Sequence, residues 1–211
     1  MKHYERIAAS SAATLILLSG CETRTASSAQ APAEIPNATV ESSIDQLRDF
    51  WVRKGIAGAA DVASVVLTDG VIGCANSDGT TQLVFADKGV ANYCAPSTIV
   101  ITRAGLRYTS RIAQANNTSA SDTTLTVLAH EFGHDIEYET HETARSHRSR
   151  EQLADCLAGM VIADIRPAAI PAGEALFHSV PADAAHGTGA QRAAAFLAGT
   201  TPGADCGIAA L

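Results

Sequence analysis

Apolar residues recur every three or four positions in several segments of the chain, which is the spacing of one buried helix face. The first segment carries Ile44, Leu47 and Trp51, with Ser42 as the expected N-cap and Gly55 as the end. Similar stripes predict three further helices, and one more segment favours a helical turn or two. The three further helices are expected over residues 122–139, 149–166 and 188–198, and the short helical segment over residues 173–180.

Between the first two helices the pattern is that of strands. Residues 62–68, 81–86 and 98–102 are short and rich in β-branched side chains, and the Asn-Ser-Asp-Gly run at 76–79 is a turn signal. We therefore predict an α+β fold in one domain over residues 42–211. A small β-sheet region would precede a helical core that ends in a C-terminal helix.

Composition and charge narrow the function classes. Hydrophobic residues make up 46% of the 211 residues, which argues against a disordered chain. The formal net charge of −7 argues against a nucleic-acid partner, because phosphate binding needs a basic surface.

The start of the chain predicts export. Lys2 and Arg6 precede an apolar run over residues 7–18, which has the layout of a signal peptide and is too short to span a membrane. The Leu-Ser-Gly-Cys run that ends at Cys21 resembles the bacterial lipobox, which implies removal of residues 1–20 and lipid attachment to Cys21. An ordinary signal peptide with a chance cysteine is the alternative.

Residues 21–41 link this anchor to the domain. They are rich in Ala, Ser, Thr and Pro and lack periodicity, which is typical of a flexible tether. The expected location is therefore extracytoplasmic, with the protein held to a membrane of the bacterial cell envelope through Cys21.

Cysteine usage agrees with export. Cys74, Cys94, Cys156 and Cys206 remain once Cys21 is assigned to the lipid, and an even number outside the cytoplasm predicts two disulfides. Four cysteines allow three pairings, and their positions leave the choice open. A four-cysteine zinc site is disfavoured, because the chain has no C-x-x-C pair.

The run His130-Glu131-Phe132-Gly133-His134 is an H-E-x-x-H motif. On a helix the two histidines share one face, where they can bind a single zinc ion. Glu131 lies between the two histidines and is poorly placed to bind the metal itself. It can reach a metal-bound water, whose pKa zinc lowers to about 7. We therefore expect Glu131 to act as the general base.

A catalytic zinc takes three protein ligands, and the third decides the class of site. A metzincin would continue with Gly at 137 and His at 140, whereas the chain has Glu137 and Thr140. His141 is one position off, about 100° around a helix. His141 and His147 also lie in a very polar run, which is typical of a solvated loop.

Glu151 is the better third ligand, because it opens the next predicted helix after room for a turn. Asp155 lies four residues later on the same face and can accept a hydrogen bond from a zinc histidine, which we expect to be His130. Each residue has an alternative interpretation. Glu151 could be a carboxylate favoured by the dipole at the N-terminus of its helix, and Asp155 could be a solvated surface residue.

Several segments together resemble the bacterial neutral zinc metallopeptidases. They are V-L-A-H-E-F-G-H, R-E-Q-L-A-D-C-L-A-G, H-G-T-G-A-Q-R and, upstream, G-V-A-N-Y-C-A-P, and they span roughly residues 60–206. The E-x-x-x-D spacing is also similar to that of the gluzincins. The resemblance implies zinc ligands at His130, His134 and Glu151, with Glu131 as base. It also implies the disulfide pairs Cys74–Cys94 and Cys156–Cys206.

Residues 186–192 also resemble the H-P-x-x-x-x-R segment of CAAX-type membrane metalloproteases, with Gly in place of Pro. This resemblance implies that His186 helps to stabilise the oxyanion and that Arg192 braces the site. The alternative is that His186 caps the last helix and Arg192 pairs with an acidic residue.

These observations favour a lipid-anchored metallopeptidase that holds one Zn²⁺ and acts on a peptide or protein substrate. Two other functions stay open: a non-proteolytic, zinc-stabilised binding module of the cell envelope, and a zinc amidase that acts on cell-wall material. A structural zinc site has no need of a general base, so the presence of Glu131 argues against the first.

Overall fold

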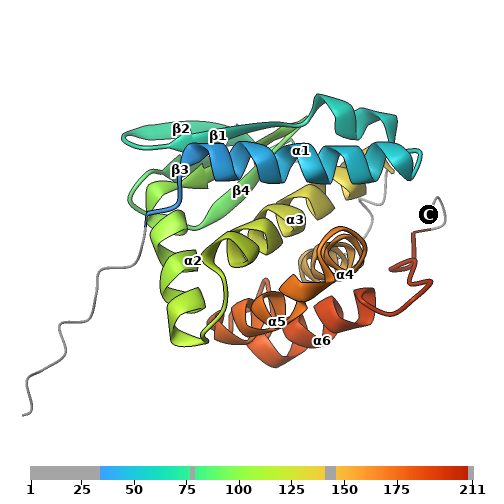
Figure 1. The fold of residues 1–211 in the computed structure, drawn as a ribbon. Helices are drawn as coiled ribbons and strands as arrows, with labels where there is room; N and C mark the ends of the chain where they lie inside the picture. Colours follow the sequence, from blue (N-terminus) through green and yellow to red (C-terminus); the bar gives the residue numbers. More distant parts are fainter. Residues whose placement is uncertain (1–33, 77–78, 141–145, 209–211) are drawn as a thin grey trace, which may run out of the picture. The chain divides into compact units, whose positions relative to one another are not determined.

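The computed structural model describes residues 34–76, 79–140 and 146–208, drawn in colour in Figure 1. The predicted signal peptide over residues 1–20, the lipid site Cys21 and much of the expected tether lie outside the described residues. Within the described ranges, no helix has both the length and the apolar character needed to cross a membrane. The elements make an α+β fold, as predicted.

Helix α1 (Asn37–Arg53) begins earlier than the sequence pattern predicts. Val40 extends the apolar stripe of this helix by one turn and is fully buried. Pro36 stands at the N-cap with a φ of −65°, which suits the start of a helix. Ser42 is therefore an interior residue, and residues 37–41 belong to the helix and not to the expected tether.

Five strands in the described ranges form two small sheets. In the first, β5 (Thr98–Thr102) lies between β1 (Ala63–Leu67), to which it runs parallel, and β4 (Ala91–Cys94), to which it runs antiparallel. The second is a hairpin of β2 (Val71–Ala75) and β3 (Thr81–Phe85). Strands β1, β3 and β5 were predicted. Strands β2 and β4 were not, because they are short and contain Gly, Ala and Asn.

The rest of the described chain is mainly helical. Helix α2 (Arg103–Ala115) was not predicted. The next long helices, α3 (Ala120–Glu139), α4 (His147–Ile165) and α6 (Gly189–Gly199), match the predicted segments to within two residues at each end. Side chains of Ser119, Ser146 and Thr188 cap α3, α4 and α6 by accepting backbone hydrogen bonds. The remaining helix is α5 (Ile170–Ser179), which overlaps the predicted short helical segment. Two short 3₁₀ helices, η1 (Ala57–Asp61) and η2 (Pro167–Ala169), complete the helical elements of the described chain.

Helix α3 is the centre of the domain. It contacts α1, α2, α4, α5 and β4, and Figure 1 shows it between α1 and the pair α4 and α5. Leu125, Leu128, Phe132 and Ile136 are completely buried along it. A helix enclosed in this way is a rigid support for the residues of the H-E-x-x-H motif.

Two glycines let helices approach closely enough to assemble the site. A Cβ atom at Gly133 would lie 2.7 Å from the Cα atom of Ala154, so only glycine allows this crossing of α3 and α4. A Cβ atom at Gly199 would overlap the carbonyl oxygen of Cys156, where α6 packs on α4. Helix α4 is therefore held against both neighbours by close backbone contact.

Two disulfides are present, with the pairing that the family resemblance implies. Cys74–Cys94 joins β2 to β4 and so links the two sheets. Cys156–Cys206 joins α4 to the segment after α6, across 50 positions of sequence. Disulfides are typical of oxidising compartments, so both bonds are compatible with an extracytoplasmic location.

Candidate metal centre

Three side chains from two helices meet at one point. His130 and His134 project from α3 and Glu151 from α4, and their ligand atoms all lie within 4.8 Å of one another. Glu151 Oε2 is 3.3 Å from His130 Nε2, and Glu151 Oε1 is 3.5 Å from His134 Nε2. Ligands at about 2.0–2.2 Å from a tetrahedral ion are about 3.3–3.6 Å apart. These residues can therefore hold a metal ion.

The surroundings of Glu151 fit such an ion. The residue is only 6% exposed, yet its Oε2 accepts no hydrogen bond from the described residues. A buried carboxylate oxygen that accepts no hydrogen bond is costly, and a cation would satisfy it. Two imidazoles and one carboxylate also leave a coordination position open, as in catalytic sites and unlike four-ligand structural sites.

A carboxylate and an arginine hold His130 in place. His130 Nδ1 lies 2.8 Å from Asp155 Oδ1, so the Nδ1–H donates there and Nε2 is left for the metal. Arg192 of α6 donates to both oxygens of Asp155, at 2.9 and 2.6 Å. Asp155 and Arg192 are buried. The predicted contact between Asp155 and His130 is present, and Arg192 also contacts His130 directly, with Nη2 3.3 Å from Nδ1 and 3.5 Å from Nε2.

A carboxylate and an arginine also lie beside His134. Glu137 Oε2 lies 3.6 Å from His134 Nδ1, one helical turn along α3. Arg150 of α4 donates to Glu137 Oε1 at 2.6 Å. Glu137 is 1% exposed, so this ion pair is formed largely inside the protein. Sequence reasoning treated Glu137 only as a mismatch to the metzincin pattern; its spacing of three from His134 was the available signal.

The electrostatics of these groups favour a charged cluster in the metal-free protein. Burial lowers the pKa of His134, but the carboxylates of Glu137 and Glu151 beside its two ring nitrogens outweigh burial and raise it to about 10. Burial raises the pKa of Glu151, but the two histidines outweigh it and hold that pKa far below its ordinary value. Metal binding must therefore displace protons from the histidines.

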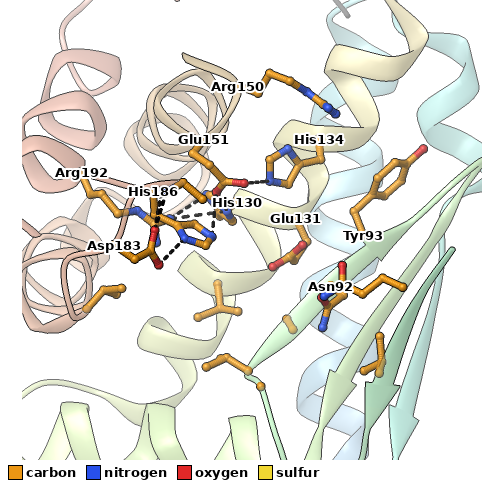
Figure 2. Close-up of a pocket in the computed structure, with 18 of the residues that line it drawn as sticks. Asn92, Tyr93, His130, Glu131, His134, Arg150, Glu151, Asp183, His186 and Arg192 are labelled. Atoms are coloured by element: carbon orange, nitrogen blue, oxygen red, sulfur yellow. Dashed lines mark hydrogen bonds and ion pairs between the residues drawn. The ribbon is translucent and has the colours of Figure 1, made fainter. Parts of the chain in front are cut away.

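Glu131 lines a cavity of about 800 Å³ together with the three ligands. Figure 2 shows its carboxylate on the side of Asn92, which belongs to β4. Glu131 is 8% exposed and lies next to His130 on α3. A group bound in the cavity can thus contact Glu131 and the metal ligands at once. Apolar residues form much of the remaining wall: Leu83, Phe85, Val90, Val127, Leu176, Phe177 and Val180.

His186 reaches this cavity from the loop before α6, as Figure 2 shows. Its Nδ1 lies 2.7 Å from Asp183 Oδ2, and its Nε2 lies 3.6 Å from Glu151 Oε2. The backbone N–H of His186, followed by its side chain, lowers the pKa of Asp183. Thr188, with Gln191 in a capping box, caps α6, so the alternative role of His186 as the helix cap is wrong.

His147 lies outside the solvated loop that its polar surroundings predicted. It is the first residue of α4, and its Nδ1 is 3.9 Å from Glu151 Oε1. Sequence reasoning missed its place at the site, although a spacing of four from Glu151 on one helix was the signal. His141 lies outside the described residues.

No family model, curated protein or solved structure matches this chain.

Proposed function

We propose that the protein is a zinc-dependent peptidase, in which His130, His134 and Glu151 hold one Zn²⁺. The observation that carries this proposal is the three-ligand cluster at the wall of a cavity, with the carboxylate of Glu131 beside it. Imidazole and carboxylate ligands in this number suit zinc. The large cavity lets an extended substrate reach the metal.

Zinc would supply Lewis-acid chemistry: it lowers the pKa of a bound water and polarises the scissile carbonyl. Glu131 accepts the proton of the attacking water and passes it to the leaving amine. In its doubly protonated form His186 donates from Nε2 to the oxygen on which negative charge develops, while its Nδ1–H donates to Asp183. Asp155 and Glu137 hold the two zinc histidines in the orientation that metal binding needs.

The open cavity and Glu131 favour a hydrolase over a purely structural zinc module. A structural site uses four protein ligands and excludes solvent, whereas this cluster has three and borders a cavity. We further propose that the protein acts outside the cytoplasm, which the two disulfides support. The lipid anchor on Cys21 is proposed from the resemblance of residues 18–21 to the lipobox alone.

A Glu131→Gln variant tests the proposed reaction. We expect it to fold and to retain its zinc, and to hydrolyse a mixed quenched-fluorescent peptide library about 10²–10⁴-fold more slowly than the wild type. Glu139→Gln is the matched control, because Glu139 is exposed at the end of the same helix. Equal rates for wild type and Glu131→Gln would remove Glu131 from the mechanism. A wild type that cleaves cell-wall fragments but no peptide would identify an amidase instead.

A further inference from the structure

Glu151 is surrounded by four histidines, of which the proposed zinc site uses two. His147 Nδ1 lies 3.9 Å from Glu151 Oε1, and His186 Nε2 lies 3.6 Å from Glu151 Oε2. Each carboxylate oxygen thus has one imidazole nitrogen from α3 and one from outside α3 within 3.9 Å. A buried carboxylate with imidazoles on two sides has the form of a bridging ligand.

The rings of the outer pair of histidines are inclined like those of the inner pair but are more widely spaced. The ring centroids of His147 and His186 are 6.0 Å apart and the rings are inclined at 79°. The corresponding values for His130 and His134 are 4.9 Å and 84°. The outer rings are somewhat farther apart, but the side chain of His147 is 63% exposed and can turn toward His186.

His186 is also prepared as a metal ligand in the way that His130 is. In both residues a carboxylate accepts from Nδ1, Asp183 at 2.7 Å and Asp155 at 2.8 Å. Such a carboxylate fixes the tautomer and leaves Nε2 with its lone pair toward the metal. In both residues that Nε2 is directed at Glu151 Oε2.

We propose that Glu151 bridges two metal ions, and that His147 and His186 hold the outer one. The outer ion would be a second Zn²⁺ or another divalent ion that prefers imidazole. This inference depends on the proposed function in one respect only, the presence of the inner ion. The outer site is weaker, because it has two imidazoles and a shared carboxylate, and because both imidazoles are partly exposed.

An outer ion would have a direct consequence for the reaction. It would occupy Nε2 of His186, the atom proposed to donate to the oxyanion. It would also lie in the cavity where the substrate binds, because His147 and His186 both line that cavity. The outer site is therefore inhibitory, and zinc in excess of the inner site would slow hydrolysis.

Zinc titration of the untagged, metal-free mature chain tests the outer site without any activity assay. We expect the wild type to bind one zinc tightly and a second one more weakly, measured by equilibrium dialysis and elemental analysis. His147→Ala and His186→Ala should each lose only the second zinc. His178→Ala is the matched control, because His178 is an exposed histidine near Glu174 on α5, and it should keep both.

The two possible failures are distinct. A wild type that stops at one zinc per chain, or a second zinc that persists in both histidine variants, overturns the outer site and leaves the inner one intact. A wild type that binds no zinc removes both sites and the proposed function.

Substitution with cobalt tests the bridge independently. Two Co²⁺ ions that share a carboxylate lie about 3.5–4 Å apart and should show coupled electron paramagnetic resonance signals. Uncoupled signals at two equivalents would contradict the bridge.

Discussion

Arg192 donates two hydrogen bonds, of 2.9 and 2.6 Å, to the buried carboxylate of Asp155. Asp155 in turn accepts from His130, so a residue of α6 helps to determine how a histidine of α3 faces the candidate metal position. Arg150 and Glu137 form a similar pair beside His134. Each of the two candidate metal-binding histidines is thus supported by a carboxylate that an arginine holds.

Asp155→Asn should weaken zinc binding about 10–100-fold, because the amide no longer accepts from His130 with a full negative charge. Competition with a chromophoric chelator on the folded protein measures the affinity. Asp164→Asn is the control, since Asp164 is exposed on the same helix. Equal affinities for the two variants would show that Asp155 does not position His130.

Glu137→Gln should also lower zinc affinity, by about 10-fold or more, because His134 loses the carboxylate beside its Nδ1. It should destabilise the protein as well, since the partly buried Arg150 loses the full charge of its buried partner. Chelator competition and thermal unfolding check the two effects separately. Zinc affinity and stability equal to those of Glu139→Gln would refute a role for Glu137.

Zinc binding should release protons and strengthen as the pH rises. The pKa of His134 in the metal-free protein is about 10, so at neutral pH this histidine carries a proton that zinc must displace. Calorimetry in buffers of different ionisation enthalpy should show release of about one proton or more at pH 7. Binding without proton release would mean that His134 is already neutral.

The stability of the metal-free protein should depend on pH in two directions. Because the pKa of folded His134 is raised, its contribution is complete below about pH 6.5 and is lost as the pH rises toward 10. Because the pKa of folded Glu151 is lowered, its contribution is present above about pH 4.5 and is lost as the pH falls. Denaturant unfolding with a chelator present should therefore show maximal stability between these limits. Stability that keeps rising above pH 7 would contradict this assignment.

Gly133→Ala should destabilise the protein by about 1–3 kcal/mol, although alanine favours a helix, because the added methyl group meets the backbone of Ala154. The same displacement would move Glu151 away from the histidines and lower zinc affinity. Thermal unfolding and chelator competition measure both effects. A variant with stability and affinity at or above the wild type would show that this helix crossing tolerates a side chain.

Local patterns were enough to predict which three side chains meet at the candidate metal centre. His130 and His134 are four residues apart on one helix, and helix geometry alone places them on the same face. The spacing of Glu151 and Asp155 from that motif predicted where the returning helix α4 would present them. Both contacts are present in the structure.

The rest depended on distant packing. The partnership of Glu137 with Arg150 exists only because α4 returns beside α3, and no single segment shows it. The placement of His186 depends on a turn held by Asp183. Helix α1 begins before its predicted start because the side chain of Val40 packs in the core. The polar, proline-containing composition of the segment before residue 42 did not predict this packing.

Zinc content of a Glu151→Ala variant tests the three-ligand centre most directly. We expect one tightly held zinc per chain in the wild type and a loss of about 10-fold or more in affinity in the variant, because two histidines alone hold zinc weakly. Elemental analysis after dialysis against a buffered zinc concentration gives both values. If the variant retains a full equivalent of zinc under those conditions, Glu151 is not a ligand and the proposed centre is wrong.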